Sequence, residues 1–216
     1  AAPIRLSRLE LHAACIHSEE SPRWMECQYR PDRRSLMFAH RGTDDDAWTK
    51  LATVGVATEV AAASSAEPLA AARLRCREPF DKARVYAYCG RLGLTYGGQF
   101  QGLVSGVRRP GECVGEVALP AELAAEAGDY LFHPALLDGC FHAMVVADAC
   151  FDHSVPGLFL PHEIREIRFL APPGPQATVH ARMTTRTSEV LEADLDVFDA
   201  EGRPCLERSE EHTSEL

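Results

Sequence analysis

The stretch His133-Pro134-Ala135-Leu136-Leu137-Asp138-Gly139-Cys140-Phe141-His142 decides the fold. Pro134 suits the first turn of an α-helix, and the apolar residues after it recur at helical spacing. We expect a helix from Pro134 to about Ala149. Four of its side chains are expected to face a hydrophobic core: Leu137, Phe141, Met144 and Val145. A long apolar helix followed by antiparallel strands predicts an α+β fold in which the sheet wraps the helix.

Regular elements are predicted on both sides of this helix. Downstream, apolar residues alternate with acidic ones over residues 191–197, the pattern of a half-exposed strand. Upstream, a strand is predicted over residues 113–119. A second helix is predicted over residues 81–92, with Asp81 as its N-cap and Gly93 as its C-terminal stop. Together these elements predict one module built around the central helix.

The earlier part of the chain has a different pattern. Residues 1–57 predict several antiparallel strands and no long helix, and the alternation over residues 25–29 predicts a half-buried strand. Residues 58–78 are mostly small, have little to bury and indicate a linker. The second module then occupies residues 79–207.

Composition excludes several classes of protein. The chain has 216 residues, of which 46% are hydrophobic and 25% charged, so it can bury a sizeable core and is not a disordered chain. Its formal net charge of −10 disfavours nucleic acid or an anionic membrane surface as the main partner. None of the eight cysteines forms a CxxC pair, so we expect reduced, mostly buried cysteines and a cytoplasmic protein.

Most familiar catalytic signals are absent or incomplete. There is no P-loop and no GxGxxG segment, so nothing supports nucleotide binding. His162-Glu163 begins like a zinc-binding HExxH motif, but Glu166 stands where the second His is required. Ser105-Gly106 lacks the spacing of a nucleophile elbow. We expect no metal ion and no directly bound cofactor.

Asp138 and His142 are the candidates for chemistry. They are four residues apart and therefore share one face of the predicted helix. A carboxyl group on an apolar helix loses hydration, which favours its protonated form and allows it to act as an acid. The same spacing is also typical of an Asp–His pair on a solvated helix surface, and the spacing alone leaves both interpretations open.

Three blocks of sequence resemble the motifs of polyketide synthase dehydratase domains, in the order found in that family. Residues 133–142 resemble HPALLDxxxQ/H. Residues 93–100 (GLTYGGQF) resemble GYxYGPxF, with Gly98 in place of Pro. Residues 160–164 (LPHEI) resemble LPFxW and differ at the third and fifth positions. The resemblance extends over roughly residues 4–207.

The resemblance implies a double hotdog fold, in which two antiparallel sheets each wrap a long helix; here the N-terminal hotdog is expected to be incomplete. It implies removal of water from a 3-hydroxyacyl thioester on acyl carrier protein, giving an enoyl thioester. The substrate is carried on the phosphopantetheine of the carrier protein. Asp138 becomes the proton donor, with His142 as its supporting neighbour. Four residues are expected to bind substrate: Tyr96, Gly97, Leu160 and Pro161.

The family's catalytic base, a His in an HxxxGxxxxP motif, has no match in the chain. Among the histidines only His153 is followed by Gly four residues later, at Gly157, and Pro161 then comes one residue too early. We therefore expect the base to lie upstream of Ala1 and the isolated chain to be inactive.

The predicted partners are acyl carrier protein and other synthase domains, and a homodimer is also compatible. Two alternative functions remain open. One is a product-template domain, which directs cyclisation of a polyketide. The other is a non-catalytic, dehydratase-like scaffold that docks carrier protein.

The last nine residues are predicted separately. Residues 208–216 (RSEEHTSEL) are polar and break the strand pattern before them. They resemble the in-frame translation of a common sequencing adapter. We expect this tail to be non-native and to carry no function.

Overall fold

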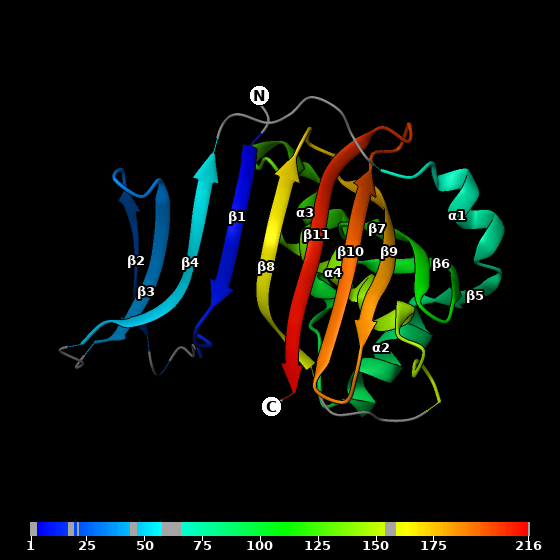
Figure 1. Cartoon of the computed structure of the whole chain (residues 1–216), viewed down its shortest axis with the longest axis horizontal. Helices are drawn as coiled ribbons and strands as arrows, with labels where there is room; N and C mark the ends of the chain where they lie inside the picture. Colours follow the sequence, from blue (N-terminus) through cyan, green and yellow to red (C-terminus); the bar gives the residue numbers. More distant parts are fainter. Residues whose placement is uncertain are drawn as a thin grey trace.

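A computed structural model describes residues 4–16, 20, 22–43, 47–57, 66–153 and 159–215, with the backbone alone described over 208–215. Its main feature is a single antiparallel sheet of eleven strands, with α2 and α4 behind it in Figure 1. The strand order is β2-β3-β4-β1-β8-β11-β10-β9-β7-β6-β5. The fold is therefore α+β, as predicted.

The strands are β1 Ile4–Leu11, β2 Arg23–Arg30, β3 Ser35–Gly42, β4 Thr49–Ala57, β5 Glu78–Asp81, β6 Leu103–Arg109, β7 Glu112–Ala118, β8 Phe159–Phe169, β9 Gln176–Arg186, β10 Val190–Phe198 and β11 Pro204–Glu215. The helices are α1 Leu69–Arg75, α2 Lys82–Arg91, α3 Ala121–Ala124 and α4 Pro134–Ala147, with 3₁₀ turns η1 Gly98–Phe100 and η2 Ala125–Asp129. The predicted strands at 113–119 and 191–197 and the helices at 81–92 and 134–149 are thus confirmed within one or two residues.

The two predicted modules share one sheet. Strand β1 pairs antiparallel with β4 on one side and with β8 on the other, and Ile4 lies opposite Phe169. The expected separate sheets are therefore continuous in this structure. In the part of the chain that is described, no helix packs on β2, β3 or β4.

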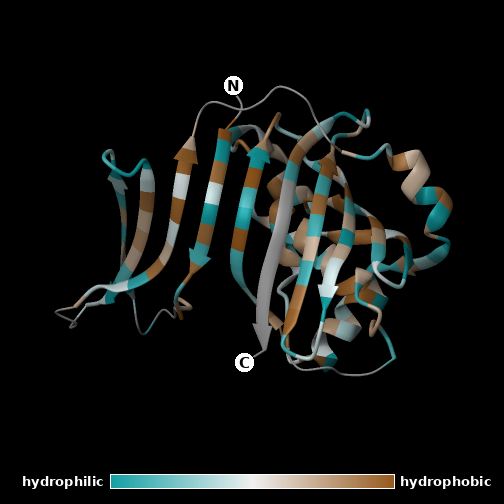
Figure 2. Cartoon of the chain, viewed as in Figure 1, coloured by the Kyte–Doolittle hydropathy of each residue, from teal (hydrophilic) through white to brown (hydrophobic). Residues whose placement is uncertain are grey.

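Helix α4 begins where the sequence predicts. The His133 side chain is the N-cap, and its Nδ1 accepts a hydrogen bond of 3.2 Å from the backbone N–H of Ala135. Pro134 takes the first helical position, where its missing N–H costs nothing. The helix packs on β6, β7, β9 and β10 and is largely apolar along its length (Figure 2).

The face that α4 turns to the sheet agrees only in part with the prediction. A Cβ atom on Gly139 would lie only 2.7 Å from Val117 Cγ1, so the helix approaches β7 at a position without a side chain. The large residues Leu137, Phe141 and Val145 are only partly buried, whereas Met144 is buried. The prediction is confirmed for Met144, while the other three pack against the core without being fully enclosed by it. Phe141 and Val145 also line a pocket.

The C-terminal end of α4 is held by a buried arginine. Arg108 is 1% exposed and donates hydrogen bonds of 2.8 Å and 3.0 Å to the carbonyl groups of Val146 and Asp148. Its guanidinium also forms an ion pair of 2.8 Å with Glu78. These bonds satisfy carbonyl groups that a helix end otherwise leaves without partners.

Helix α2 follows the prediction closely. The Asp81 carboxylate accepts a 2.8 Å hydrogen bond from the Arg84 N–H as the N-cap, and Val85 and Cys89 are buried. Gly93 follows the helix with a φ of +86°, in the left-handed region that favours glycine.

The N-terminal strands form as predicted, but their burial differs. Strand β2 lies at the edge of the sheet, and Met25 and Tyr29 are 59% and 57% exposed. The prediction of a half-buried strand over 25–29 is wrong because no described element covers this part of β2.

Two further segments differ from the sequence analysis. Part of the predicted linker, residues 58–65, lies outside the described residues, but Leu69–Arg75 is a helix whose Ala72 packs against Val114. The predicted break at residue 208 is absent, because β11 continues to Glu215 and pairs with both β8 and β10. The origin of the tail stays a prediction.

The cysteines are unpaired, and no described helix is a membrane span by itself. All eight cysteines are free, and five of them are buried: Cys76, Cys89, Cys113, Cys140 and Cys205. Among the described residues, no single helix is long and apolar enough to span a membrane; one pair, Ala121–Asp129 with Pro134–Ala147, passes together but is bent by 109°.

Deleting residues 208–216 tests the extended strand. Because β11 lies between β8 and β10, the deletion exposes backbone groups on both neighbours. At about 1 kcal/mol for each lost hydrogen bond, we expect the free energy of unfolding to fall by about 2 kcal/mol or more. Chemical denaturation of the full and shortened chains measures the difference. Equal stability would show that the tail contributes no strand.

Candidate active site

The pocket that holds the predicted residues lies beside α4. It has a volume of about 180 Å³ and is bounded by α4, the start of β8 and the start of β10. Its walls are mostly apolar and include Phe141, Met144, Val145, Phe159, Leu160 and Leu191. Such a pocket suits a hydrocarbon chain, with a small number of polar groups available to orient it.

Asp138 and His142 bring polar groups to this pocket from successive turns of α4. His142 Nε2 lies 3.2 Å from Asp138 Oδ2, and the side chains are 4% and 37% exposed, respectively. The two atoms are close enough for an electrostatic interaction but lack the angle of a hydrogen bond. Both atoms are buried and have no hydrogen-bond partner among the described residues. The solvated helix surface that the spacing also allowed is excluded for His142.

Tyr86 contacts the other side of the His142 ring. Its hydroxyl lies 3.0 Å from His142 Nδ1 and accepts a 3.0 Å hydrogen bond from the backbone N–H of Leu103. The Tyr96 ring packs edge-on against His142 at 4.3 Å between centroids. Burial raises the pKa of both tyrosines, so their hydroxyl groups stay protonated at neutral pH.

Three of the four predicted substrate-binding residues lie in the pocket. Tyr96, Leu160 and Pro161 line it together with Asp138 and His142. Gly97 does not line it; its carbonyl oxygen accepts a 2.9 Å hydrogen bond from the Phe100 N–H at the start of η1.

Sequence reasoning missed Tyr86. The available signal was an aromatic hydroxyl on the predicted helix 81–92, beside the core residue Val85. Helical spacing places Tyr86 on that helix but cannot show that it reaches His142, 56 positions later.

His153, the histidine with an incomplete base motif, is exposed in the turn after α4 and does not line the pocket. Its partner in that motif, Gly157, lies outside the described residues.

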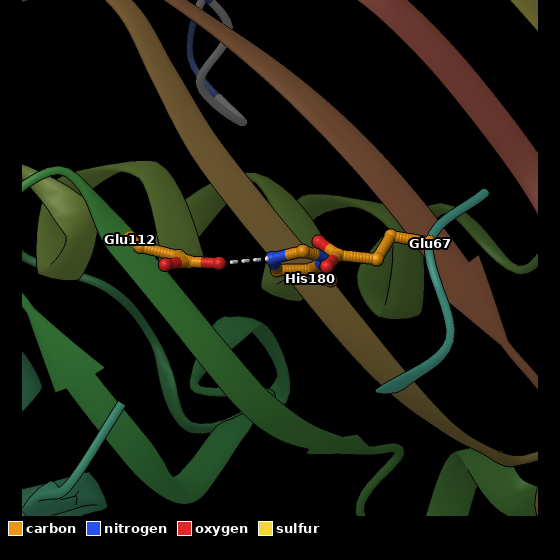
Figure 3. A group of neighbouring side chains, drawn as sticks. All are labelled: Glu67, Glu112 and His180. Atoms are coloured by element: carbon orange, nitrogen blue, oxygen red, sulfur yellow. Dashed lines mark hydrogen bonds and ion pairs between the residues drawn. The ribbon is translucent and has the colours of Figure 1, made fainter. Parts of the chain in front are cut away.

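A second polar cluster lies away from the pocket. Glu67, Glu112 and His180 place potential ligand atoms within 4.8 Å of one another (Figure 3). Arg75 donates hydrogen bonds to both carboxylates, and Arg109 donates one of 2.6 Å to Glu112. A cation would have to displace guanidinium groups that already balance the negative charge. The cluster is therefore an ion-pair network rather than a candidate metal centre.

The network controls the ionisation of its buried members. Burial alone would raise the pKa of Glu112, but hydrogen bonds from Arg75, His180 and Arg109 hold it at about 2. Burial lowers the pKa of His180, so the ring is neutral at pH 7. His180 Nε2 lies 2.9 Å from Glu112, and its Nδ1 lies 2.9 Å from Arg182. The neutral ring can thus donate to Glu112 and accept from Arg182.

Glu112→Gln tests this network through the pH dependence of stability. The carboxyl pKa falls from 4.5 in the unfolded chain to about 2 on folding. Its contribution is therefore present above pH 4.5 and lost as the pH falls towards 2. The shift corresponds to about 3 kcal/mol. We expect Glu112→Gln to lower the free energy of unfolding at pH 7 by about that amount and to flatten its acid dependence.

Denaturant titrations between pH 2 and pH 7 provide the measurement. Glu67→Gln is the matched control, because Glu67 belongs to the same cluster but is 34% exposed. Its effect should be below about 1 kcal/mol. Equal losses for the two variants would contradict a buried network centred on Glu112.

Solved structures with this architecture define the class of the protein. The chain matches a dehydratase domain of a mycocerosic acid synthase-like polyketide synthase with a TM-score of 0.78 at 25% identity, covering 97% of this chain and 73% of that one. It matches the dehydratase domain from the CurJ module of curacin polyketide synthase with a TM-score of 0.85 at 20% identity, covering 100% and 76%. The fold is that of the hotdog dehydratases.

Sequence comparison then gives the family. A family model described as "Polyketide synthase dehydratase N-terminal domain" matches residues 64–214, well over half of the chain. The chain belongs to the polyketide synthase dehydratase family. The match begins inside the predicted linker and does not test the division into N-terminal and C-terminal hotdogs, which stays a prediction.

Curated relatives are much longer synthases. The phthioceranic/hydroxyphthioceranic acid synthase of Mycobacterium tuberculosis is 37% identical over 117 residues, which are 53% of this chain and 6% of that protein. The fumosorinone synthetase of Cordyceps fumosorosea is 33% identical over 140 residues, which are 60% of this chain and 3% of that protein. The chain thus spans a small fraction of the synthases that it resembles.

Proposed function

We propose that the chain provides the acid of a dehydration reaction, with Asp138 donating a proton to the departing hydroxyl group of a 3-hydroxyacyl thioester. The observation that carries this proposal is the position of Asp138. It contributes the one carboxyl group among the described pocket-lining residues, and that group is partly accessible beside apolar walls. Its supporting neighbour is the buried His142.

The proposed reaction is an elimination of water across two neighbouring carbon atoms. A base removes the proton from the carbon next to the thioester carbonyl, and that electron pair forms the new carbon–carbon double bond. The bond between the third carbon and its hydroxyl oxygen breaks, and the oxygen takes the proton of Asp138. The products are water and an enoyl thioester. Without the acid, hydroxide would have to leave, and hydroxide is a poor leaving group.

The pocket supports an acyl substrate. Tyr96, Leu160 and Pro161 bound it near the Asp138 carboxyl, and the other walls are mostly apolar. We propose that the acyl chain is delivered on the phosphopantetheine of acyl carrier protein and that no directly bound cofactor takes part. Since the sequence relatives are polyketide synthases, other domains of such a synthase are the proposed partners.

The base is proposed to come from outside these 216 residues. The sequence contains no HxxxGxxxxP motif, and His142, the histidine in the pocket, lies beside the acid on the same helix. The base must reach the carbon next to the thioester carbonyl, whereas the acid must reach the hydroxyl group on the third carbon. The proposed division of labour places the acid in this chain and the base elsewhere.

Asp138→Asn tests the acid in the synthase dehydratase that carries this sequence. Asn keeps the size of the side chain but cannot donate an acidic proton, so we expect dehydration to slow by about 10²-fold or more. Substrate binding should change little, because the pocket walls are other residues. His142→Gln should be mild, since Gln can still hydrogen-bond the carboxyl group.

The measurement is turnover of a carrier-bound 3-hydroxyacyl substrate. Asp129→Asn is the matched control, because Asp129 is exposed in η2 and does not line the pocket. Near-parental turnover by Asp138→Asn would make Asp138 a structural residue and overturn the assignment.

The isolated chain provides a second test. If the base lies elsewhere, the purified 216-residue chain should not dehydrate a 3-hydroxyacyl thioester above background, since a general base is typically worth about 10²–10⁴-fold. Mass spectrometry of the thioester after incubation gives the readout. Clear turnover would show that a residue of this chain acts as the base.

A further inference from the structure

We propose that Tyr86 is a positioning residue that fixes the tautomer of His142 and thereby decides which oxygen of Asp138 carries the acidic proton. This inference rests on the proposed role of Asp138 as acid. It starts from a chain of contacts that joins α2 to α4: the Leu103 N–H to the Tyr86 hydroxyl, and the hydroxyl to the His142 ring.

The direction of the second contact follows from the first. The Tyr86 oxygen already accepts the N–H of Leu103 at 3.0 Å. Its hydrogen then needs an acceptor, and His142 Nδ1 lies 3.0 Å away. If Nδ1 carried a hydrogen instead, that hydrogen would point at the same oxygen, and the hydroxyl hydrogen of Tyr86 would be left without an acceptor among the described residues. An unsatisfied buried donor is costly, so Tyr86 donates and Nδ1 accepts.

The tautomer of His142 then follows. A neutral imidazole carries one hydrogen, and with Nδ1 as the acceptor this hydrogen is on Nε2. Nε2 is the atom that lies 3.2 Å from Asp138 Oδ2. His142 therefore places its hydrogen-bearing nitrogen beside Oδ2, in an electrostatic contact that is not an aligned hydrogen bond.

The tautomer of His142 also determines which oxygen of Asp138 carries the proton. A hydrogen on Oδ2 would lie against the Nε2–H of His142, so a protonated Asp138 carries its hydrogen on Oδ1. Oδ2 is buried, yet the Asp138 side chain as a whole is 37% exposed and lines the pocket. We assign the accessible position to Oδ1. The acidic proton is thus directed at the pocket instead of being held by His142.

The opposite tautomer would misdirect the proton. With its hydrogen on Nδ1, His142 would offer a lone pair at Nε2, and the Asp138 proton would bond to that lone pair. Tyr96 does not replace Tyr86, because its contact with His142 is an edge-to-face packing of the two rings, with 4.3 Å between their centroids. Tyr86 is therefore the side chain that selects the productive state.

Nitrogen NMR of ¹⁵N-histidine-labelled chain tests the tautomer directly. The sequence has nine histidines, and His142→Gln assigns the signal of His142 by its disappearance. In the unaltered 216-residue chain near neutral pH, we expect a protonated Nε2 and an unprotonated Nδ1. A hydrogen on Nδ1 would overturn the proposal without need of any Tyr86 variant.

Tyr86→Phe then tests the cause. Removal of the hydroxyl should leave a mixture of the two tautomers. Tyr88→Phe is the matched control: Tyr88 lies on the same helix, is buried and donates to the carbonyl group of Cys150, away from the pocket. It should leave the His142 signals unchanged. A pure Nε2–H tautomer in Tyr86→Phe would also overturn the proposal.

Kinetics separate this proposal from the proposed function. In the synthase dehydratase that carries this sequence, Tyr86→Phe should lower kcat in proportion to the fraction of His142 that leaves the Nε2–H tautomer, about twofold for an equal mixture. KM should not change, because a wrong tautomer impairs proton transfer and not binding. An unchanged kcat would overturn the positioning role. If Asp138→Asn has no effect on turnover but the NMR result holds, the acid assignment fails and the tautomer assignment stands.

Discussion

The close approach of α4 to the sheet is the constraint on which the rest of the structure depends. It requires a position without a side chain at Gly139, directly over Val117. With Gly139 against the sheet, the bulky residues Phe141 and Val145 lie only partly buried against the core, and they form walls of the pocket. The same orientation of α4 about its axis places Asp138 at the pocket.

Residues far from the pocket hold this arrangement in place. His133 fixes the first turn of α4, and Arg108 holds its last carbonyl groups. Burying a guanidinium is favourable only when its hydrogen bonds and its charge are compensated, as Glu78 and the carbonyl groups do here. The helix is therefore fixed at both ends, and a carboxyl group on it keeps a defined position relative to β8 and β10.

The sequence predicted the elements better than their environment. Pro134, Asp81 and Gly93 are local signals of helix ends, so both helices were placed correctly. The motif around Asp138 and His142 gave the candidate acid. Burial was predicted less well: Met25 looks like a core residue until β2 is seen at an edge, and the contact of Tyr86 with His142 depends on how two helices pack. Periodicity reports on one element at a time and carries no information about such contacts.

Strand β8 joins the N-terminal strands to the rest of the sheet, because it pairs with β1 on one side and with β11 on the other. Its first residues bound the pocket, and its last residue, Phe169, is paired with Ile4 of β1. A cut in the polypeptide between residues 57 and 79 would therefore not divide the sheet. If the segment after residue 79 were exchanged into another synthase without β1, β8 would become an unpaired edge strand. That edge would lie next to the pocket that the exchange was meant to preserve.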